Sequence, residues 1–116
     1  MNRFPGAALA VLLLPTCAFA EVWTVVEGPG GKTRGTWNVT VAGGALTGNA
    51  TMTGADGRPL TFGLNGALKD GGAMIHRINA SDRNACTYIG RPQGAGYSGN
   101  VICNGASAPW MVTRGN

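Results

Sequence analysis

The residues TWNVTV, Thr36–Val41, alternate strictly between apolar and polar side chains. In an extended chain Trp37 and Val39 point to one side, and the threonines and the asparagine point to the other. Ala42–Gly44 follows as a turn, and the alternation resumes over Leu46–Thr53 with threonine and asparagine again on one face. The stretch therefore predicts two antiparallel strands, each with a buried apolar face and an outward face of Thr and Asn.

The same period recurs on both sides of this hairpin, with 20 glycines placed where turns are needed. Asp56-Gly57, Asp70-Gly71 and Asn104-Gly105 are typical hairpin turns. The inward side of one segment, Ala73–Asn79, stays open because Ile75 and Ile78 fall on opposite faces. No helical spacing of apolar residues occurs beyond the N-terminal segment. The further predicted strands are Val22–Glu27, Leu60–Leu64, Ala73–Asn79, Ala85–Arg91, Tyr97–Cys103 and Pro109–Arg114.

Eight short strands joined by short turns predict an all-β domain. We expect a small antiparallel up-and-down barrel, because nearly every connection has hairpin length; a β-sandwich is the alternative. Closure of the barrel also removes exposed sheet edges. An outer-membrane barrel is not expected, because its strands need about 9–11 residues and an apolar outward face.

The N-terminal segment predicts export. Arg3 precedes the apolar run Ala7–Leu14, and Ala18-Phe19-Ala20 fits a signal peptidase site. The run is too short for a membrane-spanning helix, which needs roughly 20 apolar residues. Residues 1–20 are therefore expected to be a signal peptide, and residues 21–116 a single periplasmic or secreted domain. The alternatives are an uncleaved membrane anchor and a lipid anchor at Cys17, although Thr16 fits a lipobox poorly.

The cysteines agree with an oxidising compartment. Once Cys17 is removed, Cys86 and Cys103 remain, and an even pair in a small exported domain predicts a disulfide. A hairpin centred on Gly94-Ala95 places these two cysteines opposite each other. The bridge would close a loop of about 18 residues and stabilise the fold by roughly 3 kcal/mol.

The charges exclude several classes of function. Without Arg3, eight basic residues face five acidic ones, a net charge of +3, and they are scattered rather than clustered as a nucleic-acid footprint requires. His76 is the single histidine, and no paired carboxylates or Gly-x-Ser-x-Gly motif suggest catalysis. We therefore expect no enzyme, no metal site and no cofactor.

Gly35-Thr36-Trp37 at the start of one strand and Leu46-Thr47-Gly48 in the next resemble the opening of small exported calycin-like barrels of bacteria. Avidin-type proteins and barrel-shaped inhibitors from bacterial envelopes belong to this group. The resemblance implies a barrel fold, and an arginine from the last strand, here Arg114, that covers the Gly-x-Trp motif. It carries over no activity, because the polar residues expected for biotin binding are missing.

The leading hypothesis is a non-enzymatic binding module that contacts a protein or a cell-envelope component. An inhibitor of an exported hydrolase is one version of it. The alternatives are a structural or surface protein, and a small-molecule carrier if the barrel holds an open cavity. The tryptophans either fill the core or form a binding surface. The first, third, fifth and seventh turns share one barrel end, and the candidate binding residues there are Lys32, Arg34, Arg58, Arg83 and Trp110.

Overall fold

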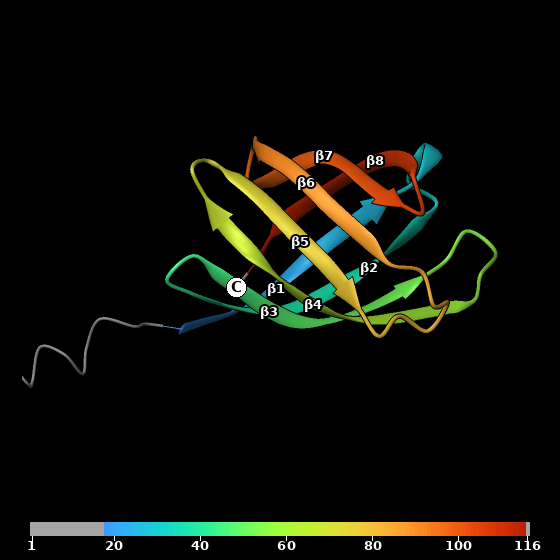
Figure 1. Ribbon diagram of the computed structural model, residues 1–116, viewed down its shortest axis with the longest axis horizontal. Coiled ribbons are helices and arrows are strands. Elements are labelled where there is room, and N and C mark those ends of the chain that lie inside the picture. Colours follow the sequence, from blue (N-terminus) through green and yellow to red (C-terminus); the bar gives the residue numbers. More distant parts are fainter. Residues whose placement is uncertain (1–17, 116) are drawn as a thin grey trace, which may run out of the picture.

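The computed structural model describes residues 18–115 and consists of eight strands and one short 3₁₀ turn (Figure 1). The predicted signal peptide, up to residue 17, and the alternative lipidation site at Cys17 lie outside the described residues. Among the described residues, no helix is long and apolar enough to cross a membrane. The elements are β1 (Ala18–Glu27), η1 (Pro29–Gly31), β2 (Thr33–Ala42), β3 (Ala45–Thr53), β4 (Pro59–Lys69), β5 (Gly72–Ile78), β6 (Cys86–Gln93), β7 (Gly96–Cys103) and β8 (Ala106–Arg114).

The strands form a closed barrel in which each one pairs with the next along the chain. All pairs are antiparallel, and β1 closes the barrel against β8, from Trp23 opposite Arg114 to Glu27 opposite Trp110. The predicted up-and-down barrel is confirmed, and the sandwich alternative is wrong. Two-residue turns such as Asp70-Gly71, with φ of 54° and 72°, supply the left-handed backbone that tight hairpins require.

Several boundaries differ from the sequence prediction. The strands are longer than expected, with ten residues in β1 and β2 and eleven in β4. The sequence pattern underestimated them because small and polar residues at strand ends carry little alternation. Strand β6 extends beyond the predicted Arg91 to include Pro92 and Gln93, and Gly94-Ala95 forms the turn on which the predicted hairpin is centred. The longest connection is 79–85, between β5 and β6.

The disulfide is present as predicted. Cys86 on β6 lies opposite Cys103 on β7, and their sulfurs are bonded. The register also places Tyr88 opposite Val101 and Gly90 opposite Gly99, as the predicted hairpin requires. The bridge therefore ties two neighbouring strands at the end of the barrel where β6 begins.

Aromatic side chains fill the interior. Trp23 and Trp37 are fully buried and stack with their ring centroids 6.1 Å apart, and Trp110 also stacks with Trp37, at 5.8 Å. A Cβ atom on Gly90 would lie 2.6 Å from the Trp110 ring, so this position needs glycine to admit the indole. The tryptophans are thus core residues, which answers the question that the sequence left open.

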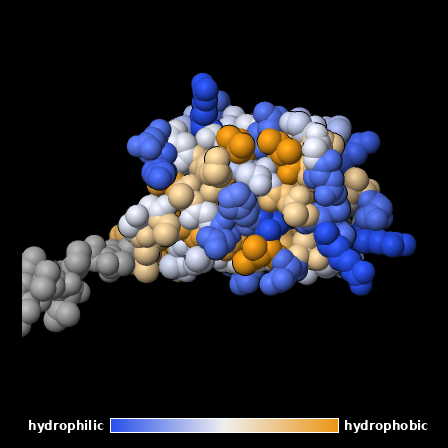
Figure 2. Space-filling view, viewed as in Figure 1, coloured by the Kyte–Doolittle hydropathy of each residue, from blue (hydrophilic) through white to orange (hydrophobic). Residues whose placement is uncertain are grey.

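The outer surface has two unlike sides. On β1–β4, Thr24, Thr36, Thr51 and Thr61 lie opposite one another in one continuous row. On β5–β8, by contrast, several large apolar side chains are exposed (Figure 2). These side chains occupy outward positions, because other residues of the same strands face the core. They are Met74, Ile78, Ile89, Ile102 and Met111.

Candidate functional site

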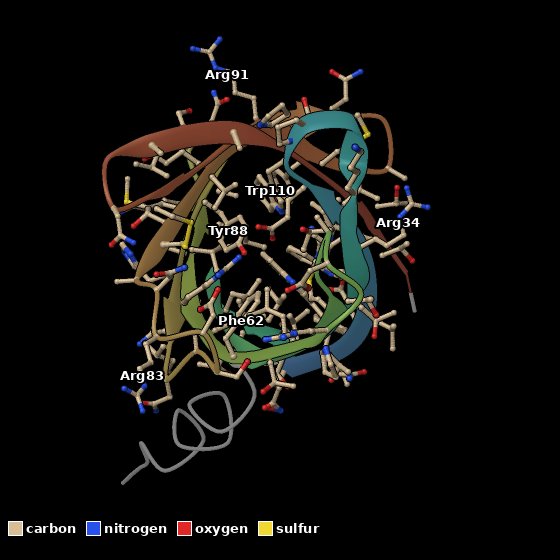
Figure 3. The ribbon with its side chains drawn as sticks, turned by 90° about the vertical axis from the view of Figure 1, so that its right-hand side faces the viewer. Arg34, Phe62, Arg83, Tyr88, Arg91 and Trp110 are labelled. Carbon is tan, nitrogen blue, oxygen red and sulfur yellow. A yellow bond between two sulfur atoms is a disulfide. The ribbon has the colours of Figure 1, made fainter. Side chains whose placement is uncertain are left out.

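Four basic residues lie at one end of the barrel, which we call the charged end (Figure 3). Lys32 is in the β1–β2 connection and Arg34 follows at the start of β2. Arg58 is in the β3–β4 connection and Arg83 in the β5–β6 connection. Alternate connections of an up-and-down barrel share one end. The topology therefore places the four cations that the sequence grouped around one rim, with Arg34 and Arg83 on opposite sides of it in Figure 3, and all four are exposed.

Most of these cations have no acidic partner within the described residues. Arg34 donates hydrogen bonds to the Gly31 carbonyl oxygen from Nε (3.2 Å) and Nη2 (2.9 Å), which fixes the preceding turn. Arg58 lies 3.9 Å from Asp56 in an exposed pair. Over residues 18–115 no salt bridge involves Lys32, Arg34 or Arg83. Their charges are consequently available to a partner.

Trp110 is not part of this surface. Its side chain is 2% exposed and lies inside the barrel, with its ring centroid 5.1 Å from that of Tyr88. The sequence prediction that placed it on the binding rim is corrected by the strand phase, because Trp110 and Val112 share the inward face of β8. Its Nε1 donor has no hydrogen-bond partner among the described residues.

A buried ion pair lies just inside the charged end. Arg77 of β5 donates from Nη2 to Oε2 of Glu27 on β1 at 2.8 Å, and from Nε to the Tyr88 hydroxyl oxygen at 2.8 Å. The Tyr88 hydroxyl donates to the other oxygen, Oε1, of Glu27 at 2.7 Å. The side chains of Glu27 and Arg77 are 7% and 4% exposed. These hydrogen bonds join β1 to β5 and β6 across the interior, although β1 pairs with neither of them.

The surroundings of this cluster keep its arginine charged and its tyrosine neutral. Burial favours loss of the proton from Arg77, but attraction to Tyr88, Glu27 and Asp82 outweighs burial and raises the arginine pKa. Burial and the neighbouring Glu27 carboxylate both raise the pKa of Tyr88, so its hydroxyl keeps the proton that it donates. The guanidinium also lies 4.3 Å above the Phe62 ring.

Asp82 connects the cluster to the loop surface. Its carboxylate lies 3.5 Å from Nη1 of Arg77 and accepts hydrogen bonds from the backbone and side-chain amides of Asn84. The 79–85 connection, which carries Arg83, is thus anchored to the buried pair. Arg77 holds the longest loop of the charged end in place.

This buried cluster was not predicted from the sequence, although part of its pattern is present in β1 and β5. Trp23, Val25 and Glu27 fall on one face of β1, so the alternation points Glu27 into the core. Arg77 shares the inward face of β5 with Ala73 and Ile75. A glutamate and an arginine, each on an otherwise apolar face, would have indicated a buried pair.

A second ion pair lies toward the opposite end. Arg114 donates from Nε and Nη2 to Glu21 at 2.9 and 2.7 Å, and Trp23 Nε1 donates to the same carboxylate at 2.8 Å. The guanidinium lies 5.3 Å from the Trp23 ring. The expectation that Arg114 covers the tryptophan of the Gly-x-Trp motif, Trp37, is therefore wrong. Trp23 is the indole that it contacts, because it lies directly opposite Arg114 in the closing ladder.

Residues that could support catalysis are not gathered in the described part of the chain. His76 lies on the outer face and shares a hydrogen bond of 3.1 Å with the Thr87 hydroxyl. Ser81 accepts a hydrogen bond from the backbone amide of Thr61. Among residues 18–115 no group of three or more His, Cys, Asp or Glu is placed to hold a metal ion. No protein-family model matches the chain, and no curated protein is significantly similar to it.

Proposed function

We propose that this chain is an exported, non-enzymatic binding protein that contacts an acidic surface of another protein through its charged end. The observation that carries the proposal is the concentration of four exposed cations there against two exposed carboxylates, Asp56 and Asp82. Buried Glu27 and Arg77 compensate each other, so the excess positive charge lies on the loops. Complementary charge of this kind speeds association and selects partners. An inhibitor of an exported hydrolase is one form of such a protein.

The structure of the first strand is compatible with cleavage after Ala20. Ala18, Phe19 and Ala20 are exposed, so their removal takes no side chain from the core. Cleavage after Ala20 leaves seven of the ten β1–β2 pairs, from Glu21 to Glu27, and the whole ladder with β8. The disulfide is compatible with an oxidising compartment.

The filled interior favours a surface-binding function over the carrier alternative. Trp37 is in ring contact with Trp23, Phe62, Tyr88 and Trp110, which occupy the centre of the barrel. An eight-stranded barrel has room either for its own side chains or for one small ligand. A purely structural protein would need no uncompensated cations on one end, and the charged end therefore favours recognition.

The test uses charge reversal at matched positions on the two ends. The mature protein, whose N-terminus is expected at Glu21, is purified from the periplasm of its host and used to capture periplasmic proteins. The Lys32→Glu/Arg34→Glu variant is compared with the Lys69→Glu/Arg91→Glu variant, which has the same net charge. The purified protein captured most strongly is then titrated against all three forms.

We expect an acidic protein whose Kd rises by about tenfold or more with the first variant and whose association slows with added salt. The second variant should change its Kd less than about twofold. Equal capture by all three forms contradicts the proposal. Binding to vesicles of phosphatidylglycerol, with no protein captured, also contradicts the proposal, because the partner is then an envelope lipid.

A further inference from the structure

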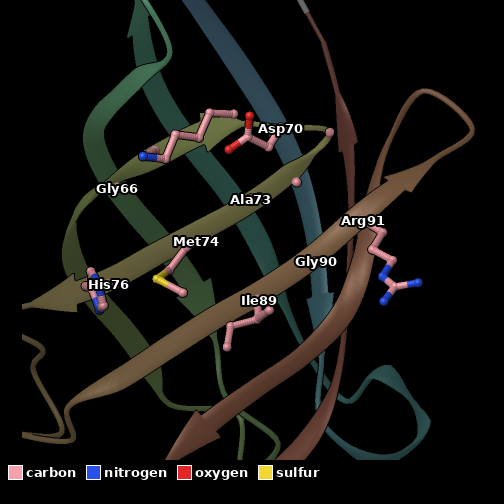
Figure 4. A pocket seen from close by; sticks show the side chains of 12 residues that line it. Gly66, Asp70, Ala73, Met74, His76, Ile89, Gly90 and Arg91 are labelled. Carbon is pink, nitrogen blue, oxygen red and sulfur yellow. The ribbon is translucent and has the colours of Figure 1, made fainter.

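A groove of about 820 Å³ lies on the outer wall at the end opposite the charged end (Figure 4). Its two sides are the β4–β5 turn, with Lys69 and Asp70, and strand β6, with Ile89 and Arg91. Its floor consists largely of glycine and alanine, which leave the backbone uncovered. The floor residues are Gly66, Ala67, Gly71, Gly72, Ala73 and Gly90.

The groove lies where β6 extends past the first residue of β5. Their ladder has four residue pairs, Ala73–His76 with Thr87–Gly90, whereas β6 and β7 are paired over eight. Residues 91–93 of β6 therefore extend beyond the ladder with β5. Pro92 in this stretch has no backbone N–H, which weakens the edge as a template for an added strand. A ligand here must be recognised mainly through side chains.

Two large apolar side chains rise from the groove. Met74 and Ile89 lie opposite each other on β5 and β6 and are 50% and 43% exposed. On the neighbouring row, the hydrogen bond between His76 and Thr87 holds the imidazole in place. Covering Met74 and Ile89 would remove apolar surface from water, which favours an apolar side chain in the ligand.

The charges along the groove select the rest of the ligand. Over residues 18–115, neither Lys69 nor Arg91 forms a salt bridge with a carboxylate. With Asp70 as the acidic residue of the lining, the groove has a positive excess. A second copy of this chain fits poorly, because its charged end is also basic and its Glu27 is buried.

We infer that this groove docks a short acidic segment of a partner protein, with an apolar side chain against Met74 and Ile89 and carboxylates toward Lys69 and Arg91. The site is separate from the charged end, and it does not depend on the function proposed for that end. Apolar contacts at the centre of the groove contribute affinity, and the basic residues on its two sides fix the orientation of a docked segment.

The probe is a phage-displayed library of random dodecapeptides selected on the folded protein. We expect selected peptides to combine Asp or Glu with Leu, Ile, Met or Phe. In fluorescence anisotropy, Lys69→Glu/Arg91→Glu and Met74→Ser/Ile89→Ser should each weaken their binding by about tenfold. Thermal unfolding confirms that each variant is folded.

One variant serves as a matched control. Ile102→Ser/Met111→Ser removes similarly exposed apolar side chains from β7 and β8 outside the groove. It should leave the affinity within about twofold. Selection of peptides without acidic residues, or equal binding to the groove variants, overturns the inference. Dimerisation abolished by Met74→Ser/Ile89→Ser also overturns it, because the occupant is then a second copy.

Discussion

Strand β1 carries two glutamates on its inward face. Each forms an ion pair with an arginine and accepts a hydrogen bond from an aromatic side chain. Glu27 pairs with Arg77 beside Tyr88, and Glu21 pairs with Arg114 beside Trp23. The chemistry is the same, but the exposure differs. The side chains are 7% and 4% exposed in the inner pair, and 13% and 33% in the outer pair.

This difference in exposure determines what each pair does for the fold. A buried charge loses its hydration, so the inner pair depends on complete hydrogen bonding to both partners. Glu27 uses both carboxylate oxygens, and Arg77 contacts Tyr88 and Asp82 in addition. The outer pair remains partly hydrated, so water can replace either partner. The stability of the core therefore depends strongly on the inner pair, whereas the outer pair adds only modestly to the stability of barrel closure.

The largest effect is expected from Arg77→Met. It leaves the Glu27 carboxylate buried without its cation, which destabilises a protein by about 3–5 kcal/mol. The measurement is urea unfolding at pH 7 with the disulfide intact. Because Arg77 also anchors Asp82, hydrogen exchange in the 79–85 connection should increase.

A second variant separates charge from packing. Glu27→Gln/Arg77→Met removes both charges and keeps an oxygen that accepts the Tyr88 hydrogen bond. It should recover part of the stability lost in the single variant. If Arg77→Met unfolds at the same urea concentration as the unchanged protein, the inner pair is not the requirement that its burial indicates.

Sequence patterns could predict the barrel and its disulfide, but not the inner ion pair or the groove. Alternation gave the barrel, because Trp37 and Val39 have to face a core, and the spacing of Cys86 and Cys103 gave the disulfide. The predicted topology also placed the four cations of the charged end together, because alternate turns of an up-and-down barrel lie at the same end. The inner pair depends on which strands face each other across the interior, and Glu27 and Arg77 are 50 residues apart. The groove depends on where the β5–β6 ladder ends, which alternation does not show.

A smaller effect is expected from Arg114→Met. The outer pair is partly exposed, so its loss should lower the free energy of unfolding by roughly 1 kcal/mol. Trp23 still donates to Glu21, and the methionine still covers part of the indole. Urea unfolding beside Arg77→Met gives the direct comparison. A loss as large as that of Arg77→Met would show that exposure does not distinguish the two pairs.

The smallest effect is expected in the acid range, where Glu21 can be tested alone. Hydrogen bonds from Arg114 lower the pKa of Glu21 despite the opposing influence of burial, and the Trp23 indole adds to the lowering. A carboxyl whose pKa is lower in the folded than in the unfolded protein adds stability above its unfolded pKa. That contribution disappears as the pH falls through the folded-state value. Glu21→Gln removes it, so the difference in unfolding free energy between the unchanged protein and this variant should be constant from pH 7 to about pH 5. Below that range the difference should shrink as Glu21 takes up its proton. Urea unfolding at each pH measures it, and a difference that grows on acidification would mean that the outer pair does not stabilise the ionised carboxylate.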